Sequence, residues 1–127
     1  MIQQSDNSRI NVALVRSVLV ASLQVEPLPT VLQQLREDLL RAVSQQHTRG
    51  VVLDLSGISG LDTDVMAHLQ ATTAMLKLMG VNSVFAGLRP GIVAALSVLS
   101  LDWTALACEI DVDRALLRFA AVGESLA

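Results

Sequence analysis

The sequence predicts an α/β fold: a mixed, mostly parallel β-sheet with an initial antiparallel strand pair and about four helices. Apolar runs of strand length alternate with segments whose apolar residues recur at helical spacing. Two β-branched runs follow each other directly at the start of the chain, whereas helical segments separate the later runs. Direct connections join antiparallel strands and helical crossovers join parallel ones, which gives the order β-β-α-β-α-β-α-β-α.

The first two strands are expected at residues 10–15 and 18–25. Only Arg16-Ser17 separates them, a hairpin-length connection, although Asn-Gly or Gly is more usual there. Pro27 and Pro29 end the second strand, and Thr30 is the expected N-cap of a helix that reaches about Gln46. The predicted buried face of this helix comprises Val31, Leu32, Leu35, Leu39 and Val43.

The run at 51–55 is apolar except for Asp54, so we expect a central strand covered on both faces. A loop containing Ser and Gly follows, and Asp62 is the expected N-cap of a second helix, with Gly80 just past its end. The predicted core stripe of this helix comprises Val65, Leu69, Leu76 and Met79, with Thr72 as a semi-polar gap and with Met66 and Met75 also assigned to the core.

The remaining elements are a strand at 84–86, an apolar helix at 92–99, an edge strand at 106–110 and a terminal helix. Asp111 is the expected cap of that last helix, Val112, Leu116 and Phe119 its apolar face, and Gly123 its end.

A chain of 127 residues can bury a core without disulfides or metals, and no repeat or linker interrupts it. We therefore expect one domain over residues 1–127, with a flexible stretch at 1–9. The hydrophobic fraction is 52% before glycine is counted, above the ~45–50% of ordinary soluble domains with glycine included. Part of this apolar surface is expected to meet another protein.

No apolar run reaches the ~18 residues of a membrane span, and the N-terminus lacks the regions of a signal peptide. A cytoplasmic location without a membrane partner is therefore expected. Cys108 is the only cysteine, which excludes an internal disulfide and leaves packing as a small hydrophobe as its expected role. A net charge of −3 and 2% aromatic residues argue against a nucleic-acid partner.

The loop at 57–64 places a hydroxyl, Thr63, between Asp62 and Asp64. Loops at the carboxyl ends of parallel strands carry function, and its glycines allow a partner backbone close. One interpretation is plain helix capping by Asp62 and Thr63, with Asp64 complementing the helix dipole. The other is a switch in which Thr63 is phosphorylated.

The energetics of that switch favour an effect on binding over one on folding. A phosphate adds about −1.5 to −2 charge, and a helix N-terminus stabilises it by ~0.3–1 kcal/mol. Two carboxylates about 6 Å away oppose it by on the order of 1 kcal/mol each. The effects nearly cancel in the isolated domain, but repulsion grows at an interface that excludes water.

The run VVLDLSGISGLDT at 51–63, the helix end LKLMG at 76–80 and the later AGLRPGI at 86–92 resemble the STAS domain of sulfate transporters and anti-sigma-factor antagonists. The likeness extends over residues 10–121, and it is greatest to RsbS-type scaffold proteins of the bacterial stressosome and to the STAS half of their RsbR partners. The resemblance implies a single STAS domain without catalytic residues, built with RsbR-like paralogues into a large cytoplasmic assembly and able to form homo-oligomers.

The resemblance also implies the partners of the switch. An RsbT-like serine/threonine kinase is sequestered, phosphorylates Thr63 and is released to regulate a stress response, and a PP2C-type phosphatase resets the system. We expect Ser59, Gly60, Asp62, Asp64 and Arg89 to form the switch loop and partner-binding surface, with Arg89 either solvated or paired with a partner's acid or an added phosphate. The chain is too short for the sensor domain of RsbR-like proteins, which favours the RsbS-like role.

This sequence departs from the family pattern at three positions. Thr63 replaces the usual serine, Ala95 stands where RsbR-like proteins carry a second phosphorylatable threonine, and Asp64 stands where other antagonists have a small or apolar residue. A stand-alone anti-sigma-factor antagonist and a small-ligand-binding STAS module are the alternatives.

Enzymatic and metal-binding roles find little support in the motifs. The pattern Asp62-Thr63-Asp64 matches the Asp-x-Asp of glycosyltransferases only by chance, and the glycine loop is neither a nucleophile elbow nor a phosphate loop. His47 and His68 have no second His or Cys at ligand spacing, so we expect no metal and no other cofactor. Trp103 serves either as an interface anchor or as filling at the edge of the core.

Overall fold

The computed structural model describes residues 10–24, 26–97 and 107–120. Within them the elements are β1 (Ile10–Val15), β2 (Val18–Leu23), α1 (Pro29–Gln45), β3 (Gly50–Asp54), α2 (Thr63–Leu78), β4 (Ser83–Ala86), α3 (Pro90–Ser97), β5 (Cys108–Glu109) and α4 (Val112–Leu117). The predicted element order is therefore confirmed.

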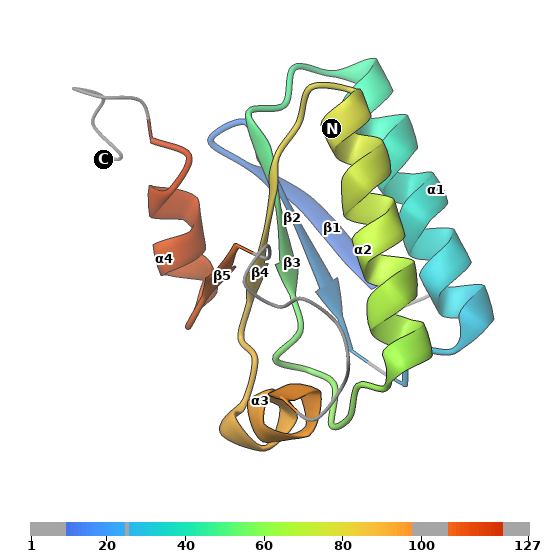
Figure 1. Ribbon diagram of the computed structural model, residues 1–127. Coiled ribbons are helices and arrows are strands. Elements are labelled where there is room, and N and C mark those ends of the chain that lie inside the picture. The colour runs from blue at the N-terminus through green and yellow to red at the C-terminus, as the bar shows by residue number, and fades with distance from the viewer. Residues whose placement is uncertain (1–9, 25, 98–106, 121–127) are drawn as a thin grey trace.

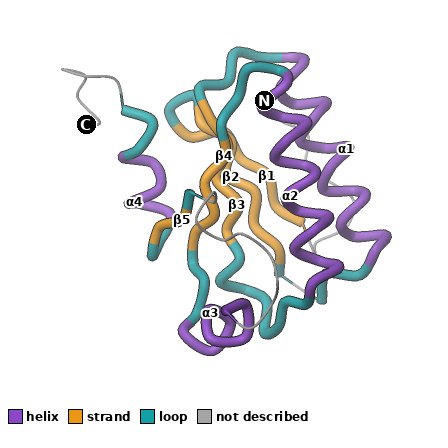
Figure 2. Tube along the Cα trace, viewed as in Figure 1, coloured by secondary structure: helices purple, strands orange, loops and turns teal. Residues whose placement is uncertain are grey.

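The strands form one sheet in the order β1-β2-β3-β4-β5. β1 pairs with β2 antiparallel, and the other neighbours are parallel, as predicted. Figure 1 shows α1 and α2 on one face of the sheet, α4 on the other, and α3 at the end where the parallel strands finish. The tube in Figure 2 shows that the loops that follow β3 and β4 and the starts of α2 and α3 gather at this same end.

The hairpin predicted at Arg16-Ser17 is confirmed, and its backbone explains how a sequence without glycine makes it. Both residues have positive φ angles, 50° and 68°, as a type I′ turn requires. The backbone N–H of Arg49 donates to the carbonyl oxygen of Ser17 over 2.7 Å, which ties the turn to the start of β3. This contact helps to hold two non-glycine residues in a left-handed backbone conformation that favours glycine.

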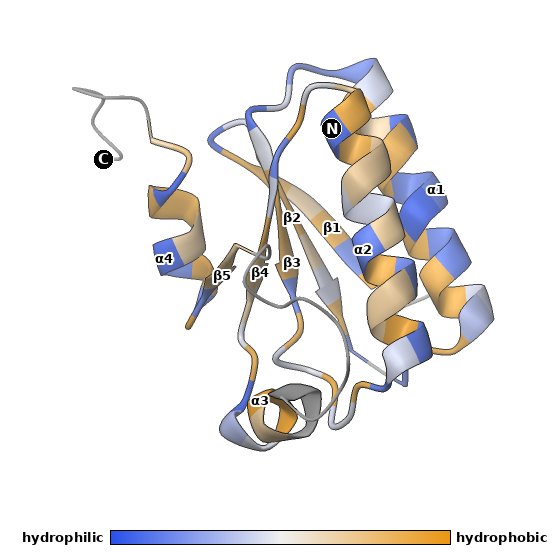
Figure 3. Cartoon of the chain, in the orientation of Figure 1, coloured by the Kyte–Doolittle hydropathy of each residue, from blue (hydrophilic) through white to orange (hydrophobic). Residues whose placement is uncertain are grey.

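β3 is the centre of the core, because its side chains are buried on both faces of the sheet. Val51 and Leu53 pack beneath α1 and α2, and Val52 packs on the opposite side with Ala115 of α4. In Figure 3 the central strands are largely apolar, and hydrophilic residues gather on the outer side of α1. This sandwich fixes the carboxyl end of β3, from which the candidate site begins.

The boundaries of three helices differ from the prediction. α3 begins at Pro90 instead of residue 92, because proline suits the first helical position. Thr30 is not an N-cap: Leu28 holds that position without a side-chain hydrogen bond, and Pro29 begins α1, since its fixed φ angle suits the first helical residue. α4 ends at Leu117 instead of Gly123, which lies outside the described residues. Phe119, just past α4, still packs against the second core cluster, as predicted for that apolar face.

The buried face of α2 is rotated from the predicted stripe. Met66, Leu69, Thr72 and Leu76 are its buried residues, whereas Val65 is only partly buried. Met75 and Met79 were predicted in the core, but they are 38% and 43% exposed. The predicted end is correct, because Gly80 has a φ angle of 88° and its N–H donates to the carbonyl oxygen of Lys77.

Candidate functional site

The site begins at the carboxyl end of β3, where Asp54 connects neighbouring segments. One of its carboxylate oxygens accepts the backbone N–H of Ser56 at 3.0 Å, and the other accepts the hydroxyl of Ser22, on β2, at 3.4 Å. A polar residue ends this apolar strand because its side chain organises the following loop.

The loop between β3 and α2 is anchored by apolar side chains. Leu55 and Ile58 are 0% and 2% exposed and belong to the main core cluster. Gly57 packs so closely that a Cβ atom there would collide with the carbonyl oxygen of Leu23. Its close approach is therefore to this chain and not to a partner, whereas at Gly60 a Cβ would meet no atom within 4 Å.

Asp62 is the N-cap of α2, as predicted. Its carboxylate accepts the backbone N–H of Val65 at 2.8 Å, and its carbonyl oxygen accepts that of Met66 at 3.0 Å. Thr63 and Asp64 are the first two helical residues, and both are exposed. The hydroxyl of Thr63 thus sits on a fixed helix start where another protein can reach it.

Arg89 reaches back from the loop after β4 to the loop after β3. Its Nη2 donates to the carbonyl oxygen of Ser56 over 2.7 Å, so one of its donors is already engaged within the chain. Gly87 lies against the same loop, with a φ angle of 78°, and a Cβ at this position would be 2.8 Å from that of Ser56. Ser59, Gly60 and Arg89 are exposed around this junction.

A groove of about 600 Å³ runs beside the start of α2, and the sequence analysis did not anticipate it. One wall is the segment before and at the start of α1, residues 26–29 and Leu32, and the other is formed by residues 59–62, Asp64, Val65 and His68. Glu26, Asp62 and Asp64 give it carboxylates, while Leu28, 51% exposed, gives it an apolar side chain. The prolines at 27 and 29 are the only sequence signal there, because their fixed φ angles favour a rigid connection.

His68 links this groove to the contact between α1 and α2. Its Nδ1 lies 3.3 Å from Nη2 of Arg36, whose Nε donates to the hydroxyl of the buried Thr72 over 2.9 Å. Burial, and then the positive charge of Arg36, lower the pKa of His68. A neutral ring can accept a hydrogen bond from Arg36, which suits this arrangement.

Within residues 10–24, 26–97 and 107–120, no group of His, Cys, Asp and Glu side chains is arranged to hold a metal ion. Cys108 was expected to pack as a small hydrophobe, but it is exposed. The surrounding protein still withdraws its thiol partly from water, and this partial desolvation raises the pKa of Cys108 and makes the reactive thiolate scarcer. Trp103 lies outside the described residues.

The described helices include none that is both long and apolar enough to cross a bilayer. The sequence pattern of the STAS domain matches residues 9–109, most of the chain, including β1 to β5 and the whole loop at 57–64. The chain belongs to the STAS domain family.

Relatives of this STAS domain include the RsbT co-antagonist protein RsbRA of Bacillus subtilis (strain 168), which is 29% identical over 70 residues. The match covers 55% of this chain and 26% of RsbRA, so the chain spans about a quarter of that relative's length. Solved structures that share the fold include two from RsbS and the stressosome. A serine-to-glutamate variant of RsbS from Moorella thermoacetica has a TM-score of 0.75 at 24% identity, covering 88% of this chain and 95% of that one.

The second structure is a chain of the stressosome, which is described as a signal integration and transduction hub. It has a TM-score of 0.70 at 21% identity, and the match covers 85% of this STAS domain and 94% of that chain. Both structures are under 25% identical to this STAS domain, so what they share with it is the fold.

Proposed function

We propose that this STAS domain is a non-enzymatic, RsbS-like scaffold protein of a cytoplasmic stressosome. It assembles with an RsbR-like paralogue, sequesters an RsbT-like serine/threonine kinase, and releases that kinase when Thr63 is phosphorylated. The proposal is supported by the likeness to RsbRA and to the RsbS and stressosome chains. A PP2C-type phosphatase completes the cycle by removing the phosphate.

The single observation that carries the proposal is the exposed Thr63 at the capped start of α2. A kinase needs a hydroxyl that it can reach without unfolding the substrate. The Asp62 cap before it and the buried Met66 after it hold the backbone on either side, so that the modification changes surface charge and leaves the core unchanged. The groove beside it offers a partner both apolar and acidic contacts.

Phosphorylation in this acidic setting favours release. Asp62 and Asp64 flank the hydroxyl, and Glu26 lines the adjoining groove, so a phosphate concentrates negative charge on one surface. A kinase whose docking surface excludes water has to bury this repulsion. The expected result is a lower affinity for the kinase, with little change in the free energy of unfolding.

The test is to incubate the chain with its cognate RsbT-like kinase and ATP and to measure the intact mass. Wild type should gain one phosphate and Thr63→Ala none. Ser56→Ala is the matched control, because Ser56 is an exposed hydroxyl residue of the same loop that lies outside the partner-binding surface, and it should be labelled like wild type. Equal labelling of wild type and Thr63→Ala would reject Thr63 as the site.

Assembly separates the scaffold from a stand-alone anti-sigma-factor antagonist. Size-exclusion chromatography with light scattering, with and without an RsbR-like partner, should show a large complex that Thr63→Ala preserves. The variant should also hold the kinase more tightly once ATP is present, because it cannot be released by phosphorylation. A monomer in both samples would contradict the scaffold role.

A further inference from the structure

The turn between β1 and β2 combines a strained backbone with an exposed cation. Arg16 and Ser17 have φ angles of 50° and 68°, in the left-handed region where a bulky side chain is an outlier and where Asn-Gly is the usual choice. The side chain of Arg16 is exposed and forms no ion pair among the described residues. Strain of this kind concentrates at functional sites, so the guanidinium of Arg16 is a candidate for a contact outside the chain.

An apolar side chain accompanies this cation. Leu14 lies two residues before Arg16, near the end of β1, and is 41% exposed. We call Leu14 and Arg16 together the hairpin tip. A surface that receives the hairpin tip needs carboxylates for the arginine and an apolar contact for the leucine.

The groove beside the start of α2 has this complementary chemistry. Glu26, Asp62 and Asp64 line it, and no lysine or arginine does so among the described residues. The carboxylates of Glu26 and Asp64 form no ion pair within the described ranges, and Leu28, 51% exposed, supplies the apolar contact. The volume of about 600 Å³ lies in the ~300–1,000 Å³ range of sites that enclose a small molecule, so it suits the side chains of a turn.

The hairpin tip and the groove lie at opposite ends of the sheet. Val18, directly after the turn, pairs with Gly50 at the start of β3, whereas the walls of the groove follow the carboxyl ends of β2 and β3. Figure 1 shows the turn at the end of the sheet away from α3. A copy therefore cannot place the hairpin tip in its own groove, but it can offer the tip to one neighbour while its groove receives another.

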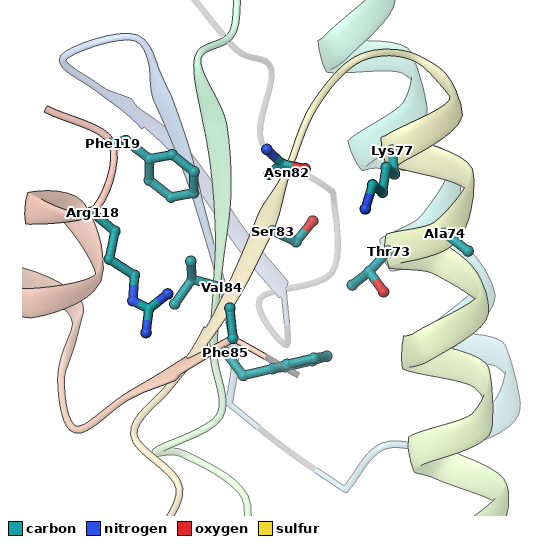
Figure 4. Close-up of a pocket in the computed structure, with 10 residues that line it drawn as sticks. Thr73, Ala74, Lys77, Asn82, Ser83, Val84, Phe85, Arg118 and Phe119 are labelled. Carbon is teal, nitrogen blue, oxygen red and sulfur yellow. The ribbon is translucent and has the colours of Figure 1, made fainter. Parts of the chain in front are cut away.

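Further cations lie at the end of the sheet that carries the turn. Arg16 and Arg49 border one small cavity, and Figure 4 shows Lys77 and Arg118 on either side of the start of β4. Arg118 is paired with Glu109, and Lys77 also complements the dipole of α2, so these two charges alone would indicate nothing. A basic end opposite an acidic groove nevertheless favours the approach of two copies in one orientation.

We propose that a second copy of this chain docks head to tail, with its hairpin tip in the groove beside the start of α2. Arg16 of one copy pairs with the carboxylates of Glu26 and Asp64 of the other, and Leu14 contacts Leu28. The contact joins two different surfaces, so successive copies form a ring or an open chain. A docked copy would also limit the access of a kinase to the adjoining Thr63. The proposal does not rest on kinase binding or on phosphorylation.

The first test is sedimentation velocity of the purified full chain, with no kinase and no RsbR-like partner present. The average mass of wild type should rise with protein concentration. It should fall again when sodium chloride is raised from about 0.1 M to about 1 M, because the screening length shortens from ~10 Å to ~3 Å. A monomer at every concentration, or association that salt leaves unchanged, would overturn the proposal.

Arg16→Asn separates association from folding. Asparagine adopts the left-handed conformation more readily than arginine, so the urea midpoint should not decrease. Loss of the guanidinium should raise the dissociation constant about tenfold or more, as expected when one partner of a charge pair is removed from an interface. Arg114→Asn is the matched control, since Arg114 is an exposed arginine of α4 without an ion pair in the described ranges, and it should associate like wild type. Unchanged association of Arg16→Asn would contradict the proposal.

A mixture of two defective variants tests the head-to-tail arrangement. Asp64→Lys reverses a charge in the groove and keeps the hairpin tip, whereas Arg16→Asn alters the tip and keeps the groove. Each variant alone should be largely monomeric, but an equimolar mixture should form dimers and nothing larger, because only one productive contact remains. A mixture as monomeric as its components would contradict the proposal. Association that appears only with an RsbR-like paralogue would assign the groove to that partner and also overturn it.

Discussion

The guanidinium of Arg89 donates a hydrogen bond to the carbonyl oxygen of Ser56 over 2.7 Å and thereby joins the loops that follow β4 and β3. From the sequence alone, we expect this arginine to be solvated or to pair with a partner's acid or an added phosphate. One donor of its Nη2 is instead used within the chain, and the guanidinium retains others for a partner. Arg89 is therefore first a support for the switch loop.

Arg89→Ala should loosen that loop without unfolding the domain. The lost hydrogen bond is exposed, so the free energy of unfolding should fall by about 0.5–1 kcal/mol, at the low end of the usual range. Amide hydrogen exchange should become faster at Gly57 and Ile58, next to the released carbonyl. Arg41→Ala, which removes an exposed arginine far from the loop, should leave these two amides unchanged. Unaltered exchange in Arg89→Ala would show that the contact does not hold the loop.

Asp62→Ala should destabilise the domain by removing the N-cap of α2. The expected loss is about 1 kcal/mol in the free energy of unfolding, measured by urea denaturation. Asp62→Asn should retain most of the stability, because an amide oxygen can accept the N–H of Val65 in the same way. A comparable loss in both variants would mean that the negative charge matters more than the cap.

Gly87→Ala should be more damaging than Gly60→Ala. At Gly87 the φ angle of 78° disfavours any side chain by ~1–2 kcal/mol, and the new Cβ would lie 2.8 Å from the Cβ of Ser56. At Gly60 the added Cβ would meet no atom within 4 Å. Urea midpoints should therefore separate the two variants clearly, and equal midpoints would argue against the tight junction of the two loops.

The sequence was sufficient for the elements and the site loop because local rules decide them. Asp62 is a capping residue placed just before a helical pattern, and the structure uses it as such. The central position of β3 follows from its almost continuous apolar run, and Asp54, its one exception, organises the next loop. In these cases the residue and its cause lie within a few positions of each other.

The predictions failed where the cause lies in a distant segment. The sequence pattern made Thr72 a semi-polar gap in an apolar stripe, but Thr72 is 1% exposed and its hydroxyl accepts a hydrogen bond from Arg36 of α1. That contact accompanies a rotation of α2 that exposes Met75. The groove beside the start of α2 has the same origin, since its walls belong to segments about thirty residues apart. No spacing within one segment could reveal it.

His68 should make the stability of the domain depend on pH below its ordinary pKa of 6.5. Burial and the neighbouring Arg36 lower its pKa in the folded state, so the unfolded chain binds the proton more readily. The contribution of His68 is therefore intact above pH 6.5 and is lost as the pH falls through the lower, folded-state value. Urea denaturation at pH values from about 7.5 to about 5 should show that the free energy of unfolding of wild type decreases as the pH falls, as the linkage relation requires. His68→Gln should flatten it, and His47→Gln, at the exposed second histidine, should leave it in place. An identical slope in wild type and His68→Gln would assign the effect to other groups.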